Sequence, residues 1–133
     1  MRGIITASLW PEPKPRKHLE DELQRAVATY LRWALPDDAT FTHLPLGGQR
    51  HTKAAARLVG FGTKAGWPDL IIVFRGRALF IELKTLAGVL SDVQKQAHKK
   101  LSYCGADVML CRSVPDVETQ LRKAGVPLKA RVC

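Results

Sequence analysis

Apolar residues recur at intervals of four from Leu19 onward, with polar residues between them. This spacing places the apolar side chains on one face and predicts a helix over residues 18–34, which Pro36 ends. A second long helix is predicted to follow Ser91. Ser91 and Gln94 have the S-x-x-Q spacing of a capping box, in which each residue satisfies a backbone amide at the start of a helix.

Two apolar, β-rich runs, 70–74 and 78–83, flank a short Arg-Gly turn signal and predict a β-hairpin. If the turn is a two-residue loop, counting outward along the strands places Asp69 opposite Glu82. Opposed side chains in an antiparallel pair lie about 4.5–5.5 Å apart at Cβ. Two carboxylates at that distance repel each other unless a cation lies near them. Lys84 is two residues beyond Glu82 and therefore on the same face, so the trio predicts a site for a hard divalent cation.

The remaining pattern predicts shorter elements: a strand over 40–44, a basic helix over 52–59, a strand over 106–111 and a last helix between Ser113 and Gly125. The strand over 106–111 follows a crossover helix, so it is expected to lie parallel to its neighbour. The chain is predicted to be α/β, with one mixed sheet flanked by helices in the order α-β-(short α)-β-β-α-β-α.

The 133 residues suit one domain, which we expect over residues 18–125. Residues 1–17 contain three prolines among charged residues and are expected to form a flexible or extended arm. The pattern assigns no structure to the tail over 126–133.

The chain carries 21 Lys and Arg against 12 Asp and Glu, a net charge of +9. A field of that sign favours a polyanionic partner such as nucleic acid. Three scattered cysteines and four histidines without ligand spacing argue against a disulfide framework and a zinc site. No apolar run approaches the length that spans a bilayer, so we expect no membrane partner and an intracellular, cytoplasmic location.

The residues alone leave a plainer interpretation of the trio open. Asp69 could be an ordinary turn residue after Pro68, and Glu82 and Lys84 could be solvated positions on an exposed sheet face. The plainer interpretation explains each residue separately better than it explains all three together. The strand face that carries Glu82 and Lys84 changes from apolar to charged at its end, where the predicted register places Asp69.

The chain resembles the VRR-NUC group of the PD-(D/E)xK nuclease superfamily. The matching segments are Gly66-Trp67-Pro68-Asp69-Leu70, Glu82-Leu83-Lys84-Thr85, Gly88, Leu90-Ser91-Asp92-Val93-Gln94, Gly105, Val108 and Arg112-Ser113, with Glu20, Leu23-Gln24 and Pro45 to Arg50 ahead of them. The resemblance covers about residues 18 to 120. Leu46 departs from the asparagine common in the group, and Arg112 is the only arginine kept from the motif that names the group.

This resemblance implies a restriction-endonuclease-like fold and metal-dependent hydrolysis of nucleic-acid phosphodiesters. It implies that Asp69, Glu82 and the backbone carbonyl of Leu83 hold Mg²⁺ or Mn²⁺. Lys84 would orient the attacking water or neutralise the charge that develops on phosphorus. These roles agree with the preference of Mg²⁺ for one or two carboxylates together with water.

Other members of the group place a glutamate of the first helix near the metal. Glu20 is the candidate, with Glu22 as the rival if the register slips, and a plain first-turn acid remains an equal alternative. Gln94 aligns with a glutamine that the group carries just outside the metal site, and it could also serve only the capping box. Candidate phosphate contacts, each of which could equally be a solvated charge, are Arg50, Lys53, Arg57 and Lys64.

Free-standing members of the group resemble phage or bacterial enzymes that act on branched DNA, including four-way (Holliday) junctions, in repair or recombination. We therefore expect a structure-selective endonuclease, and a homodimer because cutting two strands symmetrically needs two sites. The alternatives are a flap-trimming, end-trimming or restriction-like nuclease and a non-catalytic nucleic-acid-binding module.

Overall fold

The computed structural model describes residues 16–45 and 52–132, and the elements follow the order that the sequence predicts. Along the chain they are α1 (Arg16–Ala34), β1 (Ala39–His43), α2 (Thr52–Gly60), β2 (Leu70–Phe74), β3 (Arg77–Leu83), α3 (Asp92–Tyr103), β4 (Asp107–Cys111) and α4 (Val114–Lys123). The predicted α/β class is confirmed. The predicted element boundaries differ from the observed ones by one or two residues, as expected at frayed ends.

The four strands form one mixed sheet in the order β1-β2-β3-β4. The first three strands are antiparallel to their neighbours, and β4 is parallel to β3, as its crossover helix predicts. The hairpin has the predicted register, since Phe74 faces Arg77 and Leu70 faces Ile81. Both turn residues have positive φ, 48° at Arg75 and 77° at Gly76, which suits a two-residue hairpin loop.

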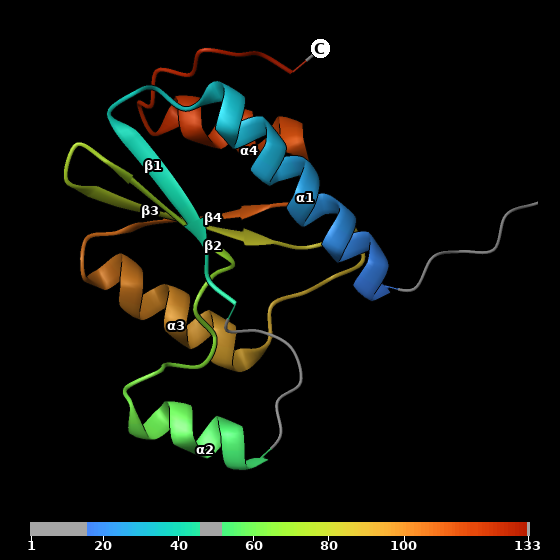
Figure 1. Cartoon of the computed structure of the whole chain (residues 1–133), viewed down its shortest axis with the longest axis vertical. Helices are drawn as coiled ribbons and strands as arrows, with labels where there is room; N and C mark the ends of the chain where they lie inside the picture. The colour runs from blue at the N-terminus through green and yellow to red at the C-terminus, as the bar shows by residue number, and fades with distance from the viewer. Residues whose placement is uncertain (1–15, 46–51, 133) are drawn as a thin grey trace, which may run out of the picture.

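Helices cover the sheet on both faces, with α1 and α4 on one side and α3 on the other (Figure 1). The main core lies on the side of α1 and α4, where Leu31 and Leu121 pack with the sheet residues Leu79 and Ile81. The residues of β3 that alternate with these point toward α3 and are buried as well, as at Phe80, which is 3% exposed. Strand β3 is therefore sandwiched between two helical layers.

Two chain ends differ from the sequence-based assignment. Helix α1 begins at Arg16, so residues 16 and 17 belong to it, and the rest of the expected arm (1–15) lies outside the described residues. Residues 126–132 pack along the helices: Val126 is 2% exposed, the Lys129 amide donates to the Ala34 carbonyl at 2.7 Å, and the Tyr30 hydroxyl donates to the Ala130 carbonyl at 2.9 Å. In the part of the chain that is described, no helix combines the length and the apolar character needed to span a membrane.

Candidate active site

Asp69 stands immediately before β2 and is fixed to both neighbouring strands. Its backbone carbonyl accepts from the Leu44 amide at 2.7 Å, and the ring nitrogen Nδ1 of His43 lies 3.1 Å from the same oxygen. Its side-chain Oδ2 accepts from the Leu83 amide at 2.7 Å. The carboxylate is therefore held beside the backbone of Leu83, one residue after Glu82.

Glu82 is 2% exposed and lies next to Asp69, as the hairpin register predicts. Burial raises the pKa of Glu82 from 4.5 to about 9, and the negative charge of Asp69 and a hydrogen bond with it act in the same direction. This burial excludes the interpretation of Glu82 as a solvated position on an exposed sheet face. A buried acid facing a second acid needs either a proton or a nearby cation.

Helix α3 binds both carboxylate oxygens of Glu82. Gln94 Nε2 donates to Oε2 at 3.4 Å, and His98 Nε2 lies 3.0 Å from Oε1. Gln94 and His98 are four residues apart, so they lie on the same face of the helix. The carboxylate is thus held from successive turns of α3.

Gln94 forms the predicted capping box and also contacts Glu82. Its Oε1 accepts from the Ser91 amide at 2.9 Å, while the Ser91 hydroxyl accepts from the Gln94 amide at 3.2 Å, so the predicted capping box is formed. Its Nε2 is left to reach Glu82. One side chain therefore begins the helix and contacts the buried acid.

Glycine at position 66 allows α3 to approach the segment that carries Asp69. Gly66 has φ +82°, and a Cβ built on it would lie 2.6 Å from the Val93 carbonyl oxygen. Only a residue without a side chain tolerates this contact together with this backbone conformation. The first turn of α3 is therefore packed directly on the turn before β2.

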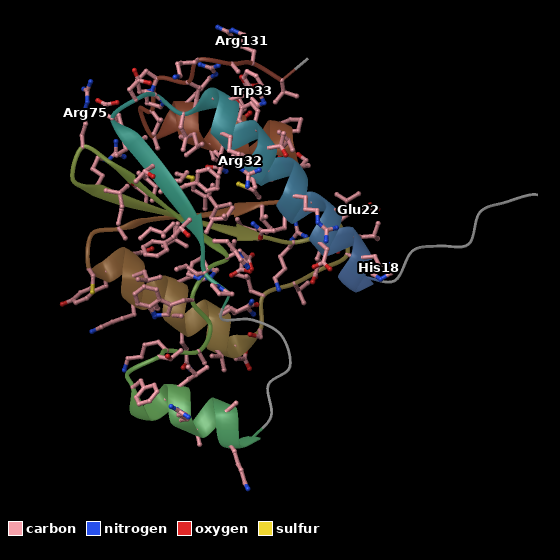
Figure 2. All side chains as sticks on the ribbon, in the orientation of Figure 1. His18, Glu22, Arg32, Trp33, Arg75 and Arg131 are labelled. Carbon is pink, nitrogen blue, oxygen red and sulfur yellow. The ribbon has the colours of Figure 1, made fainter. Side chains whose placement is uncertain are left out.

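Lys84 and Glu20 both lie within electrostatic reach of the buried acid. The Lys84 ammonium lowers the pKa of Glu82, whereas the Glu20 carboxylate raises it. Glu22, the rival in the first helix, is exposed (Figure 2). The structure thus shows an electrostatic interaction between Glu20 and the buried Glu82.

Arg112 holds the loop that follows Lys84. Its guanidinium donates to the carbonyls of Thr85 at 2.6 Å, Gly88 at 2.7 Å and Leu86 at 3.3 Å. Planar guanidinium groups suit such multiple contacts, because their donors are arranged in a rigid fork. The arginine kept from the family motif therefore fixes the backbone next to the site.

Three of the four basic candidates lie within the described residues, and all three are exposed. These candidates are Lys53, Arg57 and Lys64. The first two belong to α2, and α3 lies between α2 and the sheet (Figure 1). The Arg57 guanidinium stacks over the Phe61 ring, 5.4 Å from its centroid. Arg50 and Leu46 lie outside the described residues.

The two carboxylates fit a hard divalent cation by their chemistry. Mg²⁺ takes one or two carboxylates and keeps several waters, so Asp69 and Glu82 suffice without a dedicated cage. Within residues 16–45 and 52–132, no group of three or more His, Cys, Asp and Glu side chains is arranged to hold a metal. Glu20 is therefore near the pair without completing a three-acid cluster.

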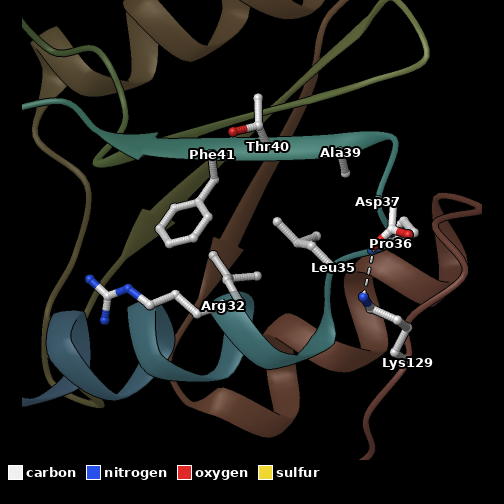
Figure 3. A pocket seen from close by; sticks show the side chains of 9 residues that line it. Arg32, Leu35, Pro36, Asp37, Ala39, Thr40, Phe41 and Lys129 are labelled. Carbon is white, nitrogen blue, oxygen red and sulfur yellow. Dashed lines mark hydrogen bonds and ion pairs between the residues drawn. The ribbon is translucent and has the colours of Figure 1, made fainter.

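A separate surface pocket lies between the end of α1 and β1 (Figure 3). It measures about 310 Å³, and its lining residues are Leu31, Arg32, Leu35, Pro36, Asp37, Ala39, Thr40, Phe41 and Lys129. Lys129 Nζ donates to Asp37 Oδ1 at its rim, at 3.1 Å. None of the candidate catalytic residues lines this pocket.

Sequence reasoning missed His98. The four histidines show no ligand spacing among themselves, so the sequence pattern gives His98 no role. A signal existed in the four-residue interval from Gln94, which places both side chains on one helix face. That signal acquires meaning only when Glu82 is known to lie under this face.

The comparisons with known proteins agree with the fold. A family model described as "VRR-NUC domain" matches residues 12–115. A solved structure titled "VRR_NUC domain protein" is 24% identical with a TM-score of 0.64, covering 84% of this chain and 89% of that one. Another, titled "VRR_NUC domain", is 19% identical with a TM-score of 0.52, covering 80% and 97%. The comparison with curated protein sequences found no match.

Proposed function

The chain belongs to the VRR-NUC family, and we propose that it is a metal-dependent, structure-selective endonuclease that hydrolyses phosphodiesters in branched DNA. The family consists of nuclease-type domains. The observation that carries the proposal is the buried Glu82 carboxyl beside Asp69, with the Lys84 ammonium within electrostatic reach. A pure binding module has no need of a buried acid that faces a second acid.

Asp69 and Glu82 would hold Mg²⁺ or Mn²⁺, with the backbone carbonyl of Leu83 as a further ligand and Glu20 as the candidate acid of the first helix near the metal. Such an ion supplies polarisation of a phosphoryl oxygen and a bound water of lowered pKa. The Leu83 amide keeps the Asp69 carboxylate turned toward the site. Lys84 contributes a compact positive charge where the pentavalent phosphorus accumulates negative charge.

Branched DNA is the proposed substrate because contacts based on charge respond to the arrangement of phosphates rather than to the base sequence. The net charge of +9 favours phosphate contacts, which position a protein on DNA without reading bases. The proposed phosphate contacts are Arg50, Lys53, Arg57 and Lys64. A homodimer would supply two active sites for paired cuts, and sedimentation of the protein tests its mass in solution.

The deciding experiment incubates purified protein with labelled four-way junction, flap, duplex and single-stranded DNA, in Mg²⁺, Mn²⁺ or EDTA. We expect cleavage only with metal, strongest on the four-way junction, and reduced about 10²–10³-fold or more by Asp69→Ala and by Lys84→Ala. Lys129→Ala, at the distant pocket, serves as the matched lysine control and should cut at the wild-type rate.

Each other outcome identifies an alternative. Preferential cutting of flaps or ends would replace the junction with a trimming role, and cutting of plain duplex would indicate a restriction-like role. Binding without cutting in every metal would favour a non-catalytic module. Equal cutting by the wild type and by Asp69→Ala would show that the active site is assigned wrongly.

A further inference from the structure

We propose that His98 is a positioning residue that holds the carboxylate of Glu82 in place beside Asp69 for metal binding. This inference rests on the proposed function and deepens it. The resemblance to the family assigns Gln94 near the site, but no residue one helical turn further along α3. His98 is the second contact from this helix, and the shorter of the two, at 3.0 Å against 3.4 Å.

The burial of Glu82 is what gives these contacts a function. A carboxylate that is 2% exposed cannot be oriented by bulk water, so its hydrogen bonds must come from the protein. His98 meets this need with a side chain that is itself only 12% exposed. A ring that merely filled space between α3 and the sheet would not need a nitrogen directed at Glu82 Oε1.

The like charge of Asp69 explains why positioning matters. Two adjacent carboxylates repel each other, and a Glu side chain has three rotatable bonds through which its charged end can move away. The Leu83 amide restrains Asp69. The contacts from His98 and Gln94 restrain Glu82, so neither acid can turn away from the other before a cation binds.

The direction of the bond fixes one feature of His98. With Glu82 ionised, Nε2 must carry the hydrogen, because a carboxylate only accepts. A replacement therefore has to place a donor at the position of Nε2, which lies farther from the backbone than Nδ1. Glutamine reaches about that far, asparagine stops one carbon short, and leucine fills volume without a donor.

The experiment measures Mn²⁺ binding to the full chain by calorimetry, without DNA, for His98→Gln, His98→Asn and His98→Leu. We expect affinity to fall about 10–100-fold in His98→Leu and His98→Asn, the usual effect of removing a partner of a metal ligand, and to recover largely in His98→Gln. Gln96→Ala, an exposed position on the same helix, is the control and should bind as the wild type does. On junction DNA, kcat should follow the metal affinity while KM for DNA stays within about twofold.

Thermal melting of each metal-free variant accompanies the binding measurements. If His98→Leu is unfolded, the comparison of His98→Gln with His98→Asn decides, because both keep a polar side chain and differ in reach. Wild-type affinity in folded His98→Leu or His98→Asn would overturn the inference and leave the proposed function intact. Absence of Mn²⁺ binding in the wild type would overturn both.

Discussion

Glu82 is the residue at which folding and proposed function oppose each other most directly. Its carboxyl is buried between β3 and α3 beside a second acid, and these surroundings raise its pKa to about 9. A structural role alone would be better served by an apolar side chain. In the metal-free protein, these surroundings destabilise the charged form of Glu82. A buried acid of this kind that lies near a second acid and a lysine is typical of a functional site.

The raised pKa predicts how the metal-free protein responds to pH. From about pH 4.5 to about pH 9, folded Glu82 keeps a proton that the unfolded chain releases, so its contribution to stability falls as pH rises. Glu82→Gln removes this dependence. In EDTA, the wild type should therefore lose more stability than Glu82→Gln as the pH rises. We expect the difference between the two melting temperatures, variant minus wild type, to increase by about 4 °C or more from pH 5 to pH 9.

The same variant supplies the control for metal binding. Mn²⁺ should raise the melting temperature of the wild type, and more at pH 8 than at pH 6, because binding requires the ionised carboxylate. It should leave Glu82→Gln unchanged. A melting-temperature difference that is flat across pH would contradict the raised pKa.

At the scale of elements, the site depends on where α3 begins. The capping box at Ser91 sets the start of the helix, and Gly66 lets this start pack against the turn before β2. The side chains of Gln94 and His98 then reach Glu82 from successive turns. A small displacement of α3 therefore changes both contacts to the buried carboxylate.

Gly66→Ala tests this dependence, with Gly62→Ala as the matched control. Both glycines have positive φ, +82° and +100°, so each substitution costs about 1–2 kcal/mol of backbone strain. Only the Cβ at Gly66 meets another group, the Val93 carbonyl at 2.6 Å, whereas nothing lies within 4 Å at Gly62. We expect urea unfolding to show an additional loss of about 1–3 kcal/mol in Gly66→Ala, together with weaker Mn²⁺ binding. Equal losses in the two variants would show that α3 does not press on this turn.

At the scale of the whole molecule, exposed basic residues lie far from the buried acid Glu82 and its neighbour Asp69. Helix α2 with its exposed Arg57 lies at one end of the molecule, and Arg131 lies at the other (Figures 1 and 2). If DNA is bound across the side that carries α2 and α3, the two arginines should contribute unequally.

Salt dependence measures this difference. We expect binding of labelled junction DNA in EDTA to weaken linearly on a logarithmic scale between about 50 and 200 mM salt. Arg57→Ala should reduce the slope by about one, since one phosphate contact is lost, whereas Arg131→Ala should leave it unchanged. Anisotropy titrations provide the measurement, and an equal effect of both variants would indicate binding through general charge alone.

Local patterns in the sequence determined much of this protein. The alternating runs and the short turn between them predicted the hairpin and its register, because the loop length fixes which residues face each other. That register is enough to bring Asp69 and Glu82 together. The S-x-x-Q spacing likewise predicted the start of α3, since both partners of a capping box lie within one turn.

Only the tertiary structure decided what surrounds these groups. Glu82 is buried and contacts His98 of α3. Residues 126–132 pack against the helices, as in the hydrogen bond from Tyr30 to Ala130. Each of these contacts depends on residues that are well separated in the sequence. Periodicity shows which side chains share a face of an element, but not which element will cover that face. Packing of α3 against the sheet determines that α3 covers this face, and it brings His98 into contact with the buried carboxyl of Glu82.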